Sequence, residues 1–500
     1  MTDLIWAFIF CQMMMGGFDS LYHHELTQRL AWRPSQRGEL SLHGVRNLSY
    51  ALIFGALGWS EPHGAWAMAL IALIAAEVVI TLWDFVEEDR SRRLPHSERV
   101  LHGILTANYG AVLVLLAPVL IDWAARPTMV LPAYYWPWSW FCAIAVVGVI
   151  ASGLRELAAA RRAPRIVPAA AAPLAAALTR RQSLLITGGT GFVGRRLVEA
   201  LVGAGHDVTV LTRDRTHAAE LPAPLRIVTS LEQITGDTRL DAIVNLAGEP
   251  ISDGLWTPAK RRRIVESRVA VTRAVLALIE RLETPPEVVV SGSAVGWHGL
   301  RGDEALDETS AGTDCFSREV CVAWEKEAAA ATGRSVRVVS LRTGLVLAAE
   351  GGMLFRLLVP FELGMGGRLG SGRHWMSWIH RDDLVRLIVH ALATPSLAGP
   401  VNATAPVPVR NAEFTSALGR ALARPAVLPV PASPLRLALG AFADELLLGG
   451  QKVMPRAALG SGFVFDYPTI DAALGAIVGN QSAASLSTKW RTPSLRSPLR

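Results

Sequence analysis

A glycine-rich turn is the stretch of this chain whose residue types and spacing point most clearly to chemistry. Residues 184–194 read LLITGGTGFVG, in which an apolar run predicts a strand and the glycines lead into a helix. The first N–H groups of such a helix bind a pyrophosphate, and Gly188, Gly191 and Gly194 let the backbone turn tightly and approach it. The pattern therefore predicts a dinucleotide site. We expect the same site to include Thr190, Phe192 and Val193.

The end of the second predicted strand, 208–212, bears on which dinucleotide is bound. At this end Arg213 and Arg215 flank Asp214. A carboxylate here accepts a hydrogen bond from the ribose 2′-hydroxyl of NAD, whereas arginines accommodate the 2′-phosphate of NADP. Two arginines against one carboxylate favour NADP, with NAD as the alternative.

The second half of the chain alternates short β-branched runs with helical stretches. This alternation predicts an α/β Rossmann-like fold, a doubly wound parallel sheet with helices on both faces. We expect a small substrate region at about 425–475 to follow it. The predicted strands are 183–187, 208–212, 226–230, 241–246, 287–292, 336–341 and 400–404. The predicted helices are 192–204, 258–282, 317–332 and 382–393.

Five motifs follow one another along this half. They are TGGTGFVG (187–194), VNLAGEPI (244–251), SGSAVG (291–296), WIHRDD (378–383) and GQKVMP (450–455). Together they resemble the atypical short-chain dehydrogenase/reductases usually labelled epimerase-family proteins, a branch akin to nucleotide-sugar epimerases and dehydratases. The resemblance covers about 183–480 and includes the C-terminal region of unknown function that marks this branch, with GFVFDYP at 462–468.

The resemblance implies roles for particular residues. Asn245, Ala247, Gly248 and Ser291 are expected to line the cofactor, and Ser293 is expected to be the active-site serine. In ordinary members of the superfamily, this serine works with a Tyr-x-x-x-Lys pair, in which the tyrosine carries the proton as hydride moves. Here Ser317 stands where the tyrosine belongs and Cys321 where the lysine belongs. The atypical branch is similar in lacking the pair.

Five positions are candidates for the missing chemistry. His298 could donate a proton at neutral pH, the alternative being a surface imidazole. Cys321 could instead be a small core residue. Arg342, at a predicted strand end, could meet an anionic substrate group. Asp382 and Asp383 are expected to cap the following helix.

The first half of the chain reads as membrane helices. Each of its apolar stretches approaches the roughly 20 residues that a helix needs to cross a bilayer. These stretches are 4–22, 45–60, 64–86, 103–125 and 136–155. The start has no basic region and no cleavage site of a signal peptide, so we expect the first helix to be retained. Arginines cluster at 29–46, 90–99 and 155–165, and this asymmetry predicts an outer N-terminus and a cytosolic second half.

The expected organisation is a membrane helical domain at 1–156, a linker at 157–181, an epimerase-like domain at 182–480 and a disordered tail at 481–500. Localisation at the inner, cytoplasmic membrane follows from this organisation. The net charge of +6 is explained by basic loops that face lipid, and we expect no nucleic-acid partner. The four cysteines are scattered, which indicates neither a disulfide framework nor a zinc site.

Histidines and carboxylates gather near the predicted cytosolic ends of the membrane helices. They are His23, His24, Glu25, Glu39, His43, Asp84, Glu88, Glu98 and His102, with Glu77 roughly 10 Å deeper at 1.5 Å per residue. One interpretation is a di-iron or di-manganese site, although such bundles use Glu-x-x-His and this chain has E-x-x-x-H. The other is pairing with the arginines of the same loops. We expect the second, and therefore no bound metal.

These patterns together predict a membrane-anchored NADP-dependent oxidoreductase or epimerase-like enzyme at the cytosolic face. Its substrate is expected to be a small molecule, apolar or isoprenoid-like in preference to a free sugar. Two alternatives remain open. One is a non-catalytic module that senses NADP(H) and regulates the bundle, and the other is a redox-coupled bundle that contains metal.

Overall fold

The computed structural model describes residues 1–92, 94–166 and 169–480. It divides the chain into two compact units with the boundary at residue 167. Arg93 of the second basic loop and the predicted tail at 481–500 lie outside the described residues.

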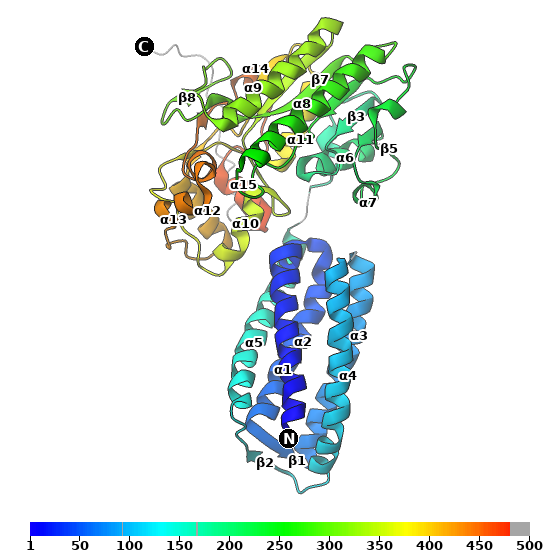
Figure 1. Ribbon diagram of the computed structural model, residues 1–500, viewed down its shortest axis with the longest axis vertical. Coiled ribbons are helices and arrows are strands. Elements are labelled where there is room, and N and C mark those ends of the chain that lie inside the picture. Colours follow the sequence, from blue (N-terminus) through cyan, green and yellow to red (C-terminus); the bar gives the residue numbers. More distant parts are fainter. Residues whose placement is uncertain (93, 167–168, 481–500) are drawn as a thin grey trace. The chain divides into compact units, whose positions relative to one another are not determined.

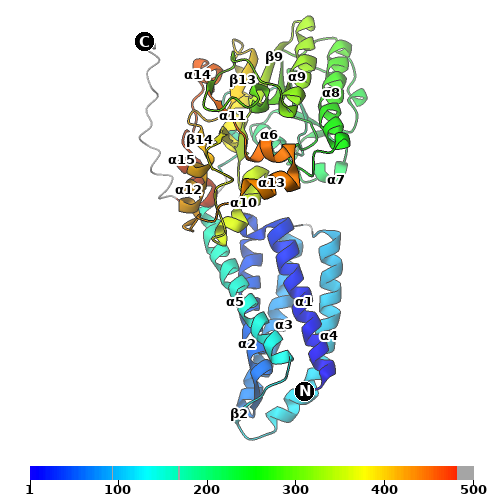
Figure 2. The ribbon, with the colours of Figure 1, turned by 60° about the vertical axis from the view of Figure 1, so that its left-hand side comes forward.

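The first unit is a bundle of long helices (Figures 1 and 2). Its elements are α1 (Asp3–Phe18), the π-helix η1 (Asp19–Gln28), the 3₁₀ turns η2 (Leu30–Trp32) and η3 (Pro34–Gln36), α2 (Arg37–Trp59), α3 (Ala65–Ser91), α4 (His96–Ala124), α5 (Trp138–Arg162) and the turn η4 (Ala163–Arg165). Two interhelical loops pair as antiparallel strands, β1 (Ser60–His63) with β2 (Met129–Pro132).

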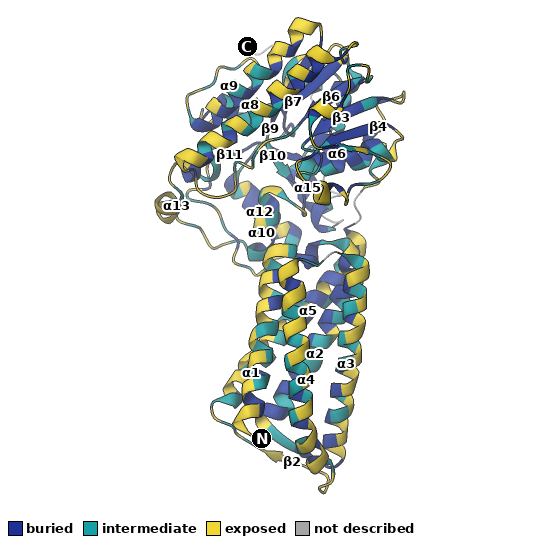
Figure 3. Ribbon diagram, turned by 45° about the vertical axis from the view of Figure 1, so that its right-hand side comes forward, coloured by how far each residue is buried: buried dark blue, intermediate teal, exposed yellow. Residues whose placement is uncertain are grey.

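The bundle is apolar on its surface and carries charged side chains inside. Figure 3 shows how buried and exposed residues are distributed along its helices. Val114 and Ile144 are 73% and 69% exposed, whereas Glu39 and Glu98 are fully buried. Among the described residues, four segments are long and apolar enough to cross a membrane. They are Asp3–Gln28, Ala65–Ser91, His96–Ala124 and Trp138–Arg165. Helix α2, which contains the predicted stretch 45–60, is not among them, because its first turns carry charged and polar residues.

The second unit contains a seven-stranded parallel sheet. Its strands, in chain order, are β3 (Ser183–Thr187), β4 (Asp207–Leu211), β5 (Arg226–Val228), β6 (Ala242–Asn245), β7 (Val288–Ala294), β9 (Arg337–Thr343) and β13 (Gly399–Ala403). Across the sheet the order is β13-β9-β7-β6-β3-β4-β5. All seven predicted strands are present, and this is the order of a doubly wound dinucleotide-binding fold.

Helices cover both faces of this sheet (Figure 1). α6 (Phe192–Gly203) and α11 (Arg381–Ala393) pack on one face, where Leu197 and Ile388 join the buried strand residues. α8 (Pro258–Arg281) and α9 (Phe316–Ala329) pack on the other, through side chains such as Val275 and Ala328. The long continuous apolar runs of the strands follow from this burial on two sides.

Shorter elements surround the ends of the sheet. They are α7 (Arg215–Ala218), η6 (Leu231–Gln233), η7 (Val295–His298), β8 (Ala305–Leu306), η8 (Ala330–Arg334), β10 (Leu345–Leu347), α10 (Gly352–Glu362), β11 (Trp375–Met376), β12 (Trp378–His380), β14 (Val409–Arg410), α12 (Asn411–Leu422), α13 (Ala432–Leu439), the π-helix η9 (Ala443–Leu447), β15 (Lys452–Val453), α14 (Arg456–Gly460) and α15 (Ile470–Val478). Strand β15 pairs with β8, and β10 with β12.

The region predicted as a linker, 157–181, contains ordered elements at both ends. Helix α5 continues to Arg162, and the 3₁₀ turn η5 (Ala172–Ala175) lies within the second unit. Leu174 and Ala175 belong to the same core cluster as α6 and α11. Part of the predicted linker is therefore packed structure, because residues of η5 pack against α6 and α11 of the second unit.

Candidate functional site

The glycine-rich turn lies where the order of the sheet reverses. β3 has β4 on one side and β6 on the other, so the connections that leave it diverge at this point. Thr187, the last residue of β3, is paired with Asn245, the last residue of β6. In open α/β sheets, ligands bind in the crevice beside the carboxyl ends of the two strands at such a switch point.

The turn itself has the shape of a pyrophosphate cradle. Gly188 has a φ of +70°, and the Gly191 N–H donates to the Gly188 carbonyl over 3.0 Å. A Cβ on Gly188 would lie 2.9 Å from the Ala247 nitrogen, and a Cβ on Gly194 would collide with the Gly188 oxygen. Helix α6 starts at Phe192 without a side-chain cap. The residues therefore fit a dinucleotide, because the glycines allow the tight turn and the uncapped start of α6 offers backbone N–H groups to a pyrophosphate.

The other residues of the turn take different roles. The Phe192 ring packs beside Gly351 and lies 5.3 Å from the guanidinium carbon of Arg381. Val193 packs against the core of the sheet, and Thr190 is half-buried. The side chains of Phe192 and Val193 are thus used in packing, which leaves their backbone groups for the predicted cofactor contact.

The predicted cofactor residues on β6 and β7 are mostly structural in their side chains. The Asn245 amide is buried and bonds Thr187 Oγ1 at 2.6 Å and Thr272 Oγ1 at 2.9 Å. Ala247 donates its N–H to Thr187 Oγ1, and Ser291 is fully buried. The Asn245 side chain therefore holds the ends of β3 and β6 together, and the expectation that Asn245, Ala247 and Ser291 line the cofactor stays a prediction.

Gly248 is required for a close approach by an arginine. An added Cβ would lie 3.0 Å from the guanidinium carbon of Arg268, whose Nη1 donates to the Glu249 and Ile264 carbonyls. Arg268 also lies 5.0 Å from the Trp324 ring. Gly248 thus allows Arg268 to hold the loop that follows β6.

The end of β4 separates its one carboxylate from its two arginines. Asp214 accepts from the Thr216 N–H at 2.8 Å and from the Thr216 hydroxyl at 2.6 Å, and it contacts His217 Nδ1 at 2.9 Å. The hydrogen bonds from Thr216 lower the pKa of Asp214. Arg213 and Arg215 are exposed, and neither guanidinium group has a partner within the described residues. The geometry therefore leaves the arginines, and not the carboxylate, available to a ribose substituent.

Ser293 lies at the end of β7 and contacts a carboxylate. Its hydroxyl donates to Glu325 Oε1 over 2.6 Å. Arg342 holds this carboxylate from the other side with two hydrogen bonds of 2.9 Å, and its guanidinium carbon lies 3.9 Å from the Trp297 ring. Arg342 therefore orients Glu325, and its role as a partner for an anionic substrate stays a prediction.

The two residues that replace the Tyr-x-x-x-Lys pair have structural partners. The hydroxyl and N–H of Ser317 both donate to Glu445 Oε2, at 2.7 and 2.9 Å, at the start of α9. Cys321 is buried, and burial raises its thiol pKa to about 11. A thiol that stays protonated at neutral pH cannot supply the positive charge of the missing lysine. Both side chains therefore have partners within the fold, and their part in proton transfer stays a prediction.

His298 is fully buried and is not a surface imidazole. Its Nε2 lies 3.2 Å from Asn402 Oδ1, and burial lowers its pKa. Asp382 forms an ion pair with Arg196 at 2.8 Å, and Asp383 accepts from the N–H groups of residues 466 and 467, both at 2.9 Å. Each of these side chains therefore contributes to the fold, and His298 is a neutral core group instead of an exposed acid.

Glu325 was missed in the sequence, although a signal for it exists. It lies on α9 four residues after Cys321 and eight after Ser317, so all three share one helix face. A carboxylate on the face that carries the Tyr-x-x-x-Lys positions is a candidate for replacing their chemistry. Glu445 had no such signal, because it reaches α9 from a separate element, η9.

This arrangement defines the class of the second unit. A parallel doubly wound sheet, a glycine cradle at the switch point and a serine at the end of β7 are typical of dinucleotide-binding short-chain dehydrogenase/reductases.

Within this class, the chain belongs to the epimerase family. Residues 184–403 match the NAD dependent epimerase/dehydratase family, and residues 430–477 match a domain of unknown function, DUF1731. An Arabidopsis thaliana relative, the chloroplastic homolog of epimerase family protein SDR39U1, is 42% identical over 60% of this chain and 87% of its own length. Epimerase family protein YfhF of Bacillus subtilis is 34% identical over 60% of this chain and 99% of its own length.

A solved structure agrees with these matches. The crystal structure of human epimerase family protein SDR39U1 with NADPH superposes with a TM-score of 0.53 at 34% identity. It covers 60% of this chain and 99% of the human chain. The family predicted from the five ordered motifs is therefore confirmed for the second unit.

Proposed function

We propose that the chain is an NADP-dependent oxidoreductase or epimerase-like enzyme that is anchored in a membrane. The observation that carries the cofactor choice is the end of β4, where Asp214 is occupied by its own turn while Arg213 and Arg215 are exposed. A 2′-phosphate carries the negative charge that such arginines bind. The human relative whose crystal structure contains NADPH supports the same choice, and NAD remains the alternative.

The role assigned to Ser293 is to transfer a proton between the substrate and Glu325. The nicotinamide, when bound, supplies or accepts a hydride. The Ser293 hydroxyl donates to Glu325, so its oxygen keeps lone pairs for a substrate hydroxyl, and the carboxylate can take up a proton passed through the serine. Arg342 fixes the carboxylate by two hydrogen bonds, so Ser293 and Glu325 together take the place of the missing tyrosine and lysine.

Membrane anchoring is supported by the surface of the first unit. Its exposed side chains include many large apolar ones, and its four long apolar segments have the length of membrane spans. Arginine-rich loops after residues 28, 89 and 154 favour a cytosolic side for the second unit, at the inner membrane. An enzyme held at the bilayer is suited to an apolar, isoprenoid-like small molecule.

One observation favours a second function. Ser317 and Cys321 stand in place of the usual tyrosine and lysine, and both are engaged in contacts within the fold. A module that binds NADP(H) without catalysis and regulates the bundle would need the cradle alone.

Purified full-length protein in detergent separates the two functions. We expect NADPH oxidation with at least one carbonyl compound of an isoprenoid-like and sugar-nucleotide panel, and its loss in Ser293→Ala and Glu325→Gln. Thr309→Ala, which removes an exposed hydroxyl bonded only within its own turn, is the matched control. Tight NADPH binding without oxidation of the cofactor by any compound would refute the enzyme and favour the sensor.

A further inference from the structure

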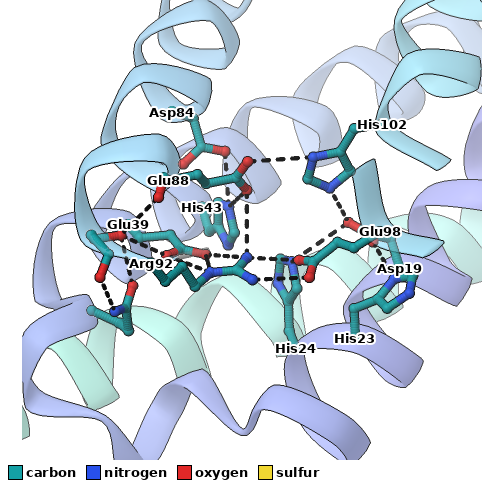
Figure 4. Close-up of polar contacts among 12 residues, drawn as sticks. Asp19, His23, His24, Glu39, His43, Asp84, Glu88, Arg92, Glu98 and His102 are labelled. Atoms are coloured by element: carbon teal, nitrogen blue, oxygen red, sulfur yellow. Dashed lines mark hydrogen bonds and ion pairs between the residues drawn. The ribbon is translucent and has the colours of Figure 1, made fainter. Parts of the chain in front are cut away.

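Ten ionisable side chains come together at one end of the helical bundle, and all of them except Glu156 are labelled in Figure 4. This His/carboxylate cluster draws on all five helical segments. Its members are Asp19, His23 and His24 of η1, Glu39 and His43 of α2, Asp84 and Glu88 of α3, Glu98 and His102 of α4, and Glu156 of α5. All are buried except His102, whose side chain is 13% exposed. Burying so many ionisable groups is costly unless they are compensated, so the cluster calls for a physical explanation.

The first part of the cluster centres on Asp19. One oxygen of its carboxylate lies 3.1 Å from His102 Nε2 and 3.5 Å from His24 Nε2. His24 Nε2 also lies 3.7 Å from Glu98 Oε1. One donor atom from each of these four residues lies within 4.8 Å of every other.

The second part shares His24 and adds Glu39, His43 and Glu88, again with donor atoms within 4.8 Å of one another. Glu88 connects the two parts. Its Oε1 lies 3.5 Å from His43 Nε2, and its Oε2 lies 3.3 Å from His102 Nδ1. A carboxylate in this position has one oxygen toward each group, as a bridging ligand does.

Three of the converging residues have donor atoms that are not hydrogen-bonded. Within the described residues, neither ring nitrogen of His24 or His43 and neither carboxylate oxygen of Glu88 has a hydrogen-bond partner. His43 Nε2 lies 2.8 Å from Asp84 Oδ2, but not in hydrogen-bonding geometry. His24 and His43 are stacked, with ring centroids 4.5 Å apart. Buried polar atoms are nearly always paired, so unpaired donor atoms that lie within 4.8 Å of one another indicate a ligand among them.

The charges of the cluster point the same way. Within the described residues, its six carboxylates form ion pairs with two guanidinium groups. Arg92 contacts Glu39 and Glu98, and Arg46 contacts Asp84. With neutral histidines, four negative charges are left in a buried site. Two divalent cations would balance them, and neutral imidazole is the form of histidine that binds metals.

The helix that supplies Asp19, His23 and His24 has an unusual conformation. Residues Asp19–Gln28 form a π-helix of ten residues, a geometry that is rare and frequently occurs at functional sites. It brings His23 Nδ1 to 2.8 Å from Asp19 Oδ1, while Asp19 Oδ2 faces His102. His23 thus holds Asp19 in place as an outer partner, an arrangement that commonly orients metal ligands.

We propose that the cluster binds a pair of divalent first-row transition-metal ions. Imidazole and carboxylate together suit iron, manganese and zinc, and buried pairs of such groups on facing helices form the dinuclear sites of helical bundles. Bond lengths of about 2.0–2.2 Å place two ligands of one ion up to about 4.4 Å apart, close to the observed span of the donor atoms. The structure thus favours the interpretation that the sequence left as the alternative.

Pairing with arginines alone explains fewer of the buried groups than a metal pair does. Arg92 satisfies Glu39 and Glu98 well, with contacts of 2.7 to 3.1 Å. It does not account for Glu88, whose nearest oxygen lies 3.9 Å from the guanidinium, or for the two stacked histidines. A metal pair explains these groups and leaves Arg92 as a partner for the ligand carboxylates.

The test uses full-length protein in detergent, treated with a chelator, incubated with MnCl2 alone and freed of excess metal. We expect about two Mn²⁺ per chain by elemental analysis and the low-temperature EPR signal of a coupled pair. His43→Ala, His102→Ala and the isosteric Glu88→Gln should each lose most of this manganese. His63→Ala is the matched control, because His63 is a buried histidine of the same unit on β1, outside the cluster.

Circular dichroism and size-exclusion chromatography show whether each variant keeps its helical fold. A wild-type protein that retains almost no manganese would overturn the proposal. Equal retention by Glu88→Gln and His63→Ala would overturn it as well, because the metal would then be bound elsewhere. One ion per chain without a coupled EPR signal would overturn the assignment of a pair.

Discussion

The choice of cofactor rests on Arg213, and its removal should change one measured ratio. A guanidinium bonded to a phosphate contributes about 1.5–3 kcal/mol when it is shielded from water. Arg213 is exposed and its interaction is screened, so we take the lower end, about 1.5 kcal/mol, which is slightly more than tenfold in affinity. The unmutated protein should bind NADPH at least about tenfold more tightly than NADH, and Arg213→Ala should remove this preference.

Isothermal titration of the full-length protein with each cofactor measures the ratio directly. NADH affinity should hardly change in Arg213→Ala, because Asp214 keeps its bonds to Thr216 and the cradle is untouched. Arg226→Ala is the matched control, since Arg226 is an exposed arginine on the adjacent strand β5 that donates to the Gln233 carbonyl. Equal affinities for the two cofactors in the unmutated protein would refute the reasoning about this strand end.

Three further predictions concern the cradle, the acid stability and the topology. Gly194→Ala should weaken NADPH and NADH binding alike by more than about tenfold, because the added Cβ would collide with the Gly188 oxygen. Gly333→Ala, which has open space around it, should leave binding unchanged, and titration with both cofactors measures the two variants. Burial lowers the pKa of His380 to about 4, so the unfolded state binds its proton first. The contribution of His380 to stability should be complete above the ordinary histidine pKa of 6.5 and fall as the pH decreases from there toward 4. His380→Asn, which keeps an acceptor for the Asp382 N–H, should flatten part of this fall in denaturant titrations, and an unchanged pH profile would contradict it. A reporter fused after Arg181 should behave as cytosolic and one fused near Pro127 as external. The opposite result would mean that the bundle has the reverse orientation in the membrane.

The second unit could be predicted well because its signals are local. Each strand of the sheet is a short β-branched run buried on two faces, and the glycine turn after β3 has the spacing that a pyrophosphate site needs. Short strands such as β10, β12 and β15 were not predicted, since two or three residues carry no period. They form because partners distant in sequence, such as β8 for β15, offer an edge.

The candidate catalytic groups show the limit of sequence reasoning. Ser293 and Glu325 are separated by 32 residues, and only the packing of α9 beside β7 brings the carboxylate to the serine. Ser317 and Cys321 occupy the expected positions on α9, but their partners, Glu445 and the Ala294 carbonyl, come from elsewhere in the fold. The positions of Ser317 and Cys321 on the helix could be predicted from the sequence, but the hydrogen bonds that these residues form with distant groups could not.

In the bundle, too, the positions of the ionisable residues could be predicted from the sequence, but their partners could not. The spacing of its histidines and carboxylates predicted one level of ionisable groups, but Glu25 pairs with Arg155 instead of joining it. Asp19 and Glu156 take part without having been predicted. Glu77 lies apart and accepts from Thr81 at 2.6 Å and from Tyr109, so neutral hydroxyl groups compensate its burial. Which members of the level converge depends on the rotation of each helix.

Hydride transfer by the full-length protein tests the central claim most directly. NADPH labelled with deuterium at the transferring position of the nicotinamide is incubated with the protein and an isoprenoid-like aldehyde or ketone, and the product is examined by mass spectrometry. The account predicts stereospecific transfer of the label into the product, abolished in Ser293→Ala and kept in Thr309→Ala. Tight binding of NADPH with no label in any product of the carbonyl and sugar-nucleotide panel would contradict it.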